Sequence, residues 1–246
     1  MSHLKIGVAQ IASQRGDVTA NLSTHLRAIA IAASEGVNYL VFPELSLTGY
    51  EPDLAHSLAF STSDERLVPL IEAAKQNGLT VGVGLPLVGN DLPKIGLAVI
   101  SPSGQVELYE KIYLHPGEEE YFSSGKAHHF TSVNGFKIAN AICADTNNPK
   151  HAEACAKESA RIYVAGVLFT EQGYIADEEK LFGYARQYNM LVAIANHNAT
   201  TGGWTPGGKS AIWSSSGKVA SADATQNALV VAQLQDEKWV GQVVEL

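Results

Sequence analysis

Along the first third of the chain, short apolar runs alternate with longer stretches in which apolar residues recur every three or four positions. The short runs predict buried strands, and the longer stretches predict amphipathic helices. In chain order, the expected elements are a strand at 4–10, a helix at 18–36, a strand at 37–42, a helix at 63–76 and a strand at 79–85. This alternation predicts an α/β fold in which helices cover a sheet.

Two glycines and a proline punctuate this first part of the chain. Gly36 and Gly78 stand where a residue in the left-handed conformation would end each predicted helix. Pro69 falls inside the second predicted helix, where its ring would bend the backbone. We therefore expect two well-delimited helices, the second of them bent.

The middle of the chain has a different pattern, in which paired strands flank tight turns. Asn134-Gly135, between two such strands, is a strong signal for a two-residue hairpin. The expected hairpins are 94–100 with 105–109, and 129–133 with 136–142; after them come helices at 149–159 and 177–188 and strands at 162–169, 191–195, 209–213, 219–222 and 229–233. Hairpins between α/β units predict two sheets packed face to face with helices outside. Because no linker or repeat interrupts the pattern, residues 1–246 are expected to form one domain.

Composition and charge narrow the class of protein. The 246 residues are 46% apolar and 17% charged, with a net charge of −8. A chain of this size can bury a large core without disulfides, and without a basic stripe it is not expected to bind nucleic acid. Two cysteines do not make a disulfide framework and favour a reducing compartment. The start lacks a signal-peptide pattern and no apolar run reaches the roughly 18 residues of a spanning helix, so we expect a soluble cytoplasmic protein without membrane contact.

Three reactive side chains stand at the ends of predicted strands: Glu44 and Lys111 two residues past a strand, and Cys143 directly after one. Each alone could have an ordinary role, namely a solvated loop glutamate, an exposed lysine and a cysteine that packs in the core. The turn that follows Cys143 leads into the helix predicted at 149–159, and would aim the sulfur toward a helix N-terminus. Such a position is expected to lower the pKa of the thiol.

Taken together, the segments around these residues resemble the three signature segments of the carbon–nitrogen hydrolase (nitrilase/amidase) superfamily, in its amidase-like branch. The segments are FPELSLTGY at 42–50, YEKIYL at 109–114 and the strand that ends in Ile142-Cys143. The order Glu, Lys, Cys matches, and the likeness extends from KIGVAQ near the start to GKSAIWSSSGKV near the end. The resemblance implies a four-layer α-β-β-α sandwich, which the alternation of hairpins and α/β units already allows.

The resemblance also implies roles for the matching residues. Cys143 matches the nucleophile, Glu44 the general base, and Lys111 the lysine that stabilises the oxyanion. The backbone N–H of Ala144 is expected to be a second oxyanion donor. A further glutamate that positions the others matches Glu118, or Glu119 if the alignment is shifted by one residue.

The segment after the cysteine departs from the family pattern Tyr-Asp-Leu-Arg-Phe-Pro-Glu. Asp145 and Pro149 stay in register, but the arginine and the last glutamate are replaced, and Tyr113 stands where histidine is frequent. The pocket wall is therefore expected to differ from that of common relatives. The residues expected to contact substrate are Tyr50, Thr146, Phe169 and Thr170, and Glu171 is expected to be a surface carboxylate rather than a partner for a cationic substrate.

The expected function is hydrolysis of a small non-peptide amide or N-carbamoyl compound through a thioester, with release of ammonia or an amine. The alternatives are hydrolysis of a nitrile, transfer of the acyl group to an amine, and a non-catalytic scaffold that keeps the fold. No metal or organic cofactor is expected, and a homodimer is expected because family members usually pair. His128 and His129 are not expected to bind a metal as a pair, because neighbours on a strand face opposite ways, and Cys155 is expected to pack in the core.

Overall fold

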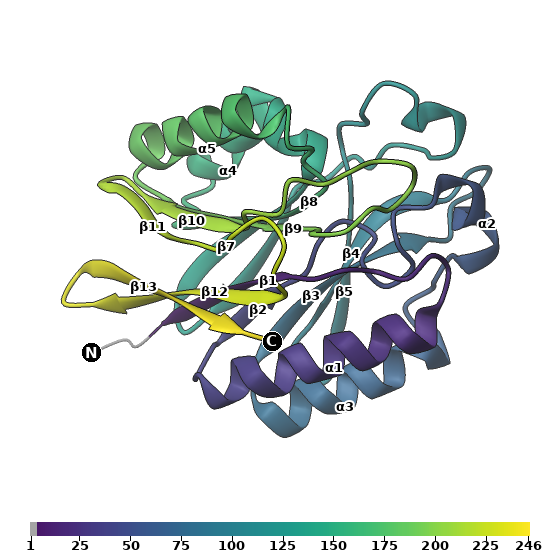
Figure 1. Ribbon diagram of the computed structural model, residues 1–246, viewed down its shortest axis with the longest axis horizontal. Coiled ribbons are helices and arrows are strands. Elements are labelled where there is room, and N and C mark those ends of the chain that lie inside the picture. Colours follow the sequence, from purple (N-terminus) through teal and green to yellow (C-terminus); the bar gives the residue numbers. More distant parts are fainter. Residues whose placement is uncertain (1–3) are drawn as a thin grey trace.

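Two β-sheets lie face to face in the computed structural model, which describes residues 4–246. Helices α1 (Val18–Ser34) and α3 (Val68–Asn77) cover the outer face of one sheet, and α4 (Pro149–Lys157) and α5 (Tyr174–Tyr188) cover the other (Figure 1). The layers therefore run helix, sheet, sheet, helix, and the predicted α-β-β-α sandwich is confirmed. Within the described residues, we find no helix long and apolar enough to cross a membrane.

The first sheet has the strand order β13-β12-β1-β2-β3-β4-β5. Its central strands β1, β2 and β3 are parallel because helices connect them, and the flanking pairs are antiparallel. The strands are β1 (Lys5–Gln10), β2 (Tyr39–Val41), β3 (Thr80–Leu87), β4 (Lys94–Ile100), β5 (Val106–Glu110), β12 (Ala228–Gln235) and β13 (Lys238–Glu245).

The second sheet has the order β11-β10-β9-β8-β7-β6, with β7, β8 and β9 parallel. Its strands are β6 (His129–Val133), β7 (Phe136–Ile142), β8 (Ile162–Val167), β9 (Leu191–Asn196), β10 (Ala211–Ser214) and β11 (Gly217–Ser221). Residues that follow parallel strands gather at the carboxyl edge of a sheet, where α/β folds commonly bind ligands. Glu44 follows β2 and Cys143 follows β7, so the segments predicted to be reactive meet at such an edge.

Most predicted elements are present within a few residues of their expected bounds; the differences include the place of Pro69 and two elements that were not predicted, the short helix α2 (Ala55–Leu58) and the strand β13. Pro69 lies in the first turn of α3, behind a short 3₁₀ turn at Glu65–Leu67, so it does not bend the helix. Proline is well tolerated there because the first-turn N–H groups have no partner within the helix. The sequence pattern did not predict β13, an edge strand that pairs with β12, because most of its side chains are exposed or half-buried and give little apolar signal.

Candidate active site

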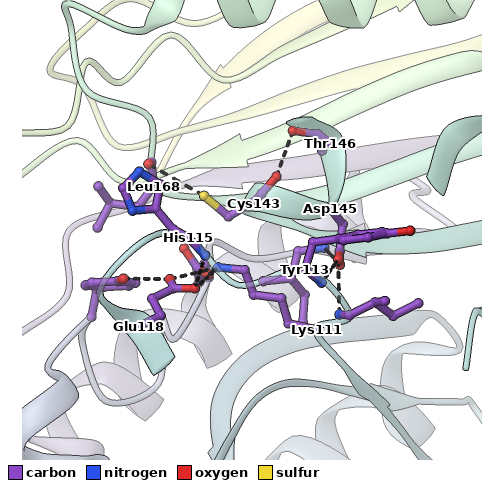
Figure 2. Close-up of polar contacts among 12 residues, drawn as sticks. Lys111, Tyr113, His115, Glu118, Cys143, Asp145, Thr146 and Leu168 are labelled. Carbon is purple, nitrogen blue, oxygen red and sulfur yellow. Dashed lines mark hydrogen bonds and ion pairs between the residues drawn. The ribbon is translucent and has the colours of Figure 1, made fainter. Parts of the chain in front are cut away.

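Glu44, Lys111, Glu118 and Cys143 lie together in the interior although they come from four segments. Glu44 follows β2, Lys111 follows β5, Glu118 lies in the 3₁₀ turn Glu118–Glu120, and Cys143 follows β7. Each of the four side chains is at most 8% exposed. Figure 2 shows Lys111 reaching toward Glu118 near the sulfur of Cys143.

The loop that carries Glu44 is held between the two sheets. A Cβ at Gly84 of β3 or at Gly166 of β8 would collide with the loop backbone, so only glycine allows this close approach. The buried ring of His197 donates from Nε2 to the Glu44 carbonyl oxygen at 2.7 Å. Leu45 adopts a φ of +52°, which is uncommon for a branched residue. The surroundings therefore impose the conformation of this loop.

Lys111 forms a buried ionic cluster with two carboxylates. Its Nζ donates to Glu44 Oε1 at 2.7 Å and to both carboxylate oxygens of Glu118 at 2.8 Å. Glu118 also accepts from the Tyr50 hydroxyl at 2.6 Å and from the His115 backbone N–H at 2.7 Å. Glu118 is thus saturated with donors, whereas Glu44 Oε2 is buried and has no hydrogen-bond partner among the described residues.

Of the two registers that the sequence left open, the geometry favours Glu118. Glu119 is exposed, and its side chain accepts from the Gly117 N–H at 2.7 Å in the same turn. The buried carboxylate beside Lys111 is Glu118.

Burial dominates the protonation of this cluster. It raises the pKa of Glu44 to about 7, since loss of water outweighs the attraction of Lys111, and the charge of Glu118 adds to the rise. The carboxylates around Lys111 keep the pKa of this lysine above its ordinary value, because their charges outweigh its own burial. Lys111 is therefore a cation at neutral pH, and Glu44 is poised to exchange a proton near pH 7.

Cys143 occupies a sharp turn between β7 and the 3₁₀ turn Cys143–Asn147. Its φ is +41°, and Sγ lies 3.7 Å from the carbonyl oxygen of Leu168, to which the thiol can donate (Figure 2). A non-glycine residue in the left-handed region stores strain, which is frequent at functional positions.

The expected lowering of the Cys143 pKa is wrong. Burial raises the pKa of the thiol well above its ordinary value, and the negative charge of Glu44 adds to this despite the opposing attraction of Lys111. In addition, α4 begins only at Pro149, so the sulfur does not lie at the N-terminus of that helix. The resting thiol is neutral, and it needs a base to become a nucleophile.

Asp145 joins the segments that carry Lys111 and Cys143. Oδ1 accepts from the backbone N–H groups of Ile112 at 3.1 Å and Tyr113 at 2.9 Å. Oδ2 accepts from the Ile142 N–H at 2.9 Å and the Tyr109 hydroxyl at 2.6 Å. This buried carboxylate therefore fixes the backbone directly after Lys111 to the backbone directly before Cys143. Its register with the family pattern was visible in the sequence, but this contact was not predicted.

A cavity of about 190 Å³ opens beside Cys143. Three of the predicted contact residues line it, namely Tyr50, Phe169 and Thr170, whereas Thr146 does not. Thr146 is buried, and its hydroxyl donates to the Cys143 carbonyl oxygen at 2.7 Å, so it supports the turn instead (Figure 2). The remaining lining residues are Glu44, His115, Glu118, Cys143, Asn147, Leu168, Gly173, Asp177 and Trp204.

The pocket lining contains residues that were not predicted from the sequence. Trp204 comes from the glycine-rich loop at 200–208, and Asp177 comes from α5. Glu171 is exposed and is not part of the lining, as expected for a surface carboxylate. A larger hollow of about 660 Å³, between Arg161 and Trp239, lies at the opposite end of the strands and contains none of the four clustered residues. We therefore place the candidate site in the smaller cavity.

The fold and this cluster define a class of protein. Residues 5–240 match the family model of the carbon–nitrogen hydrolases, and the chain belongs to that family. The family prediction made from the sequence is confirmed.

Individual relatives agree with this class. The chain is 32% identical over 165 residues to an (R)-stereoselective amidase of Pseudomonas sp, a match that covers 65% of this chain and 59% of that protein. It is 26% identical over 211 residues to a glutamine-dependent NAD(+) synthetase of Thermotoga maritima, covering 82% of this chain. The chain spans only part of these curated relatives, 36% of the synthetase and 59% of the amidase.

Solved structures show the same fold. A mutant of the amidase from Nesterenkonia sp. AN1, in complex with butyramide, superposes with a TM-score of 0.88 at 22% identity. The superposition covers 96% of this chain and 92% of the amidase.

Proposed function

We propose that this protein is a cysteine-dependent amidase that hydrolyses a small non-peptide amide or N-carbamoyl compound. The observation that carries the proposal is the buried cluster in which Lys111 binds both Glu44 and Glu118 next to the Cys143 thiol. A fully buried ionic cluster is expensive to desolvate, and a binding protein or scaffold has no need of it. The cluster also faces a cavity, so that substrate can reach the sulfur.

The acylation step follows from the residue types. Glu44 takes the proton of the Cys143 thiol, and the sulfur attacks the carbonyl carbon, whose π electrons move to the oxygen. Lys111 Nζ and the N–H of Ala144 stabilise this oxyanion, and one such donor is typically worth about 3–4 kcal/mol. Glu44 then gives its proton to the leaving nitrogen as the C–N bond breaks, which leaves a thioester on Cys143.

Hydrolysis of the thioester reverses these roles. Glu44 takes a proton from water, the hydroxide adds to the thioester carbonyl, and the same donors hold the second oxyanion. The C–S bond breaks, the sulfur recovers the proton from Glu44, and the acid leaves. A carboxylate with a pKa of about 7 suits both directions of transfer, because a general acid–base group works best near the operating pH.

Glu118 positions the reacting groups in this scheme. Each of its carboxylate oxygens already accepts two hydrogen bonds from neighbouring residues, so no lone pair is left for substrate. It holds Lys111 beside Glu44 and, through its charge, favours the cationic lysine.

The cavity supports a small substrate. A volume of about 190 Å³ is below the range of roughly 300–1,000 Å³ usual for drug-sized ligands. The structural relative that holds butyramide supports the same size class. Asn147, Asp177 and Trp204 at the pocket are the residues most able to select the group beyond the amide.

The test is a panel of small aliphatic amides and N-carbamoyl compounds, with ammonia release as the measurement. We expect turnover by the natural chain and none by Cys143→Ala, while Lys126→Ala, at an exposed lysine, should match the natural chain. Intact mass and peptide mapping should show an acyl group on Cys143 and not on Cys155. Full turnover by Cys143→Ala would refute the mechanism.

A further inference from the structure

Two histidines and a cysteine gather behind the nucleophile strand, outside the candidate active site. His151 and Cys155 lie one turn apart on α4, and His128 immediately precedes β6. One ligand atom from each lies within 4.8 Å of the others. His151 and Cys155 are fully buried and His128 is half-buried, so the cluster comes closest to solvent at His128.

We propose that His128, His151 and Cys155 form a binding site for a zinc-type divalent metal ion. One thiolate and two imidazoles are ligands that zinc prefers. In a tetrahedral site with Zn–S of about 2.3 Å and Zn–N of about 2.0–2.1 Å, a sulfur and a nitrogen ligand are roughly 3.5 Å apart. Cys155 Sγ already lies 3.8 Å from His151 Nδ1, so these two ligands need little movement.

The hydrogen bonds of His151 leave Nδ1, the ring nitrogen that faces Cys155, without a proton. The Tyr109 hydroxyl donates to Asp145, so it can only accept from His151 Nε2, which lies 3.0 Å away. Nε2 therefore carries the proton, and Nδ1 is the unprotonated nitrogen. Nδ1 accepts from the Tyr163 hydroxyl at 2.9 Å and faces Cys155. Its lone pair is therefore available to a metal ion once the Tyr163 hydroxyl releases it.

The same bonds supply the outer shell that metal-bound histidines usually have. A histidine ligand normally donates its second N–H to an oxygen, which fixes the ring and its tautomer. Here His151 donates to Tyr109, and Tyr109 donates to the carboxylate of Asp145. These bonds already fix the ring with its Nε2–H toward an oxygen and its Nδ1 toward Cys155, which is the orientation that a metal bound at Nδ1 needs.

His128 carries a buried nitrogen that simple aromatic packing would leave unsatisfied. Its Nε2 is buried and has no hydrogen-bond partner among residues 4–246. Its ring lies 4.8 Å from that of His151, centroid to centroid. An unpaired buried nitrogen costs free energy, about 1–3 kcal/mol, and a metal bond would remove this cost. The neighbouring His129 faces Glu107 and Asn140 instead, in line with the expectation that the two histidines do not act as a pair.

Binding replaces the S–H bond of Cys155 by a sulfur–metal bond, and the proton passes to the buffer. The Tyr163 hydroxyl must release Nδ1, and it or a water molecule completes the four ligands. Burial raises the pKa of Cys155 to about 12, so the free thiol is neutral and a bound ion must displace its proton. A coordinating thiol is deprotonated outright by the charge of the ion.

The experiment uses the full chain with the Cys143→Ala substitution, which removes the other thiol. Titration with Zn²⁺ followed by calorimetry should show one ion per chain, with release of one proton. Co²⁺ should give the near-ultraviolet absorption of a cobalt–thiolate bond. Cys155→Ala should abolish this absorption, and His128→Gln should abolish one-to-one Zn²⁺ binding.

Two further variants distinguish this site from adventitious binding at surface histidines. His56→Gln changes an exposed histidine on the surface and should leave Zn²⁺ binding unchanged. Tyr109→Phe removes the outer-shell oxygen and should weaken binding by roughly tenfold or more. Circular dichroism checks that each variant is folded. The proposal is overturned if the Cys143→Ala chain binds no Zn²⁺, or if folded His128→Gln and Cys155→Ala chains both bind it undiminished.

Discussion

Replacing Asp145 by asparagine tests how the two halves of the candidate site are held together. The carboxylate accepts four hydrogen bonds, two on each oxygen, and all four partners act as donors. Asparagine keeps the shape but turns one oxygen into an NH₂ group, which only donates. Either orientation leaves donors facing donors: the N–H groups of Ile112 and Tyr113 on one side, or the N–H of Ile142 and the Tyr109 hydroxyl on the other.

The second orientation is the less costly, because a hydroxyl can rotate and a backbone N–H cannot. Even then the Ile142 N–H is left buried without an acceptor, at a cost of about 1–3 kcal/mol. The remaining bonds also lose their charged acceptor, and a hydrogen bond to a charged group is worth about 1.5–3 kcal/mol. We therefore expect Asp145→Asn to lower the free energy of unfolding by about 2–5 kcal/mol.

The Asp145→Asn chain should also lose activity, because Ile142, whose N–H loses its acceptor, directly precedes Cys143 and any shift of its backbone would move the nucleophile. A misplacement of about 1 Å can cost roughly 10²-fold in rate. The measurements are urea unfolding and kcat/KM on the best amide from the panel, with Asp91→Asn, at an exposed aspartate, as the matched control. If the free energy of unfolding of the Asp145→Asn chain lies within about 0.5 kcal/mol of that of the natural chain, and kcat/KM is unchanged, then Asp145 does not hold these segments in the way described.

Three further predictions concern the pocket and the ionic cluster. Since Glu44 must be ionised to accept the thiol proton and its pKa is raised to about 7, kcat/KM should fall as pH drops through about 7; a profile that is flat from pH 5 to 8 would contradict this role. The charge of Glu118 raises the pKa of Glu44, so Glu118→Gln should move this acid limb to lower pH, and a shift to higher pH would show the sign to be wrong. Trp204→Ala should raise KM more than it lowers kcat, because Trp204 lines the cavity but supplies no reacting group in the proposed mechanism; steady-state kinetics over the amide panel measures the two parameters separately, and a fall in kcat with KM unchanged would contradict this role.

Much of the fold could be predicted because its signals are local. Strand and helix periodicity depend on which face of a segment is buried, and this can be read from a few consecutive residues. The Asn134-Gly135 hairpin is an example: both residues have positive φ, at 50° and 82°, as the tight turn requires. Gly36 and Gly78 also adopt positive φ at the ends of α1 and α3, as predicted. Family membership followed from short segments in a fixed order.

What the tertiary structure decided concerns contacts between distant segments. Thr146 was predicted in the pocket, but the turn after Cys143 directs its hydroxyl to a backbone carbonyl. Trp204 reaches the pocket from the glycine-rich segment 200–208, whose sequence predicts only a loop. No local pattern could show that Asp145 accepts from two segments at once, because the donors belong to different parts of the chain.

The protonation of the site shows this division most clearly. The sequence by itself determined the types of the groups: a glutamate, a lysine and a cysteine, each at the end of a strand. Whether the thiol is ionised depends on the water around it and on the distance to each charge, which exist only once the sheets have packed. The folded chain buries Cys143 beside Glu44, so the pKa of its thiol moves upward rather than downward, because loss of hydration outweighs the single nearby cation.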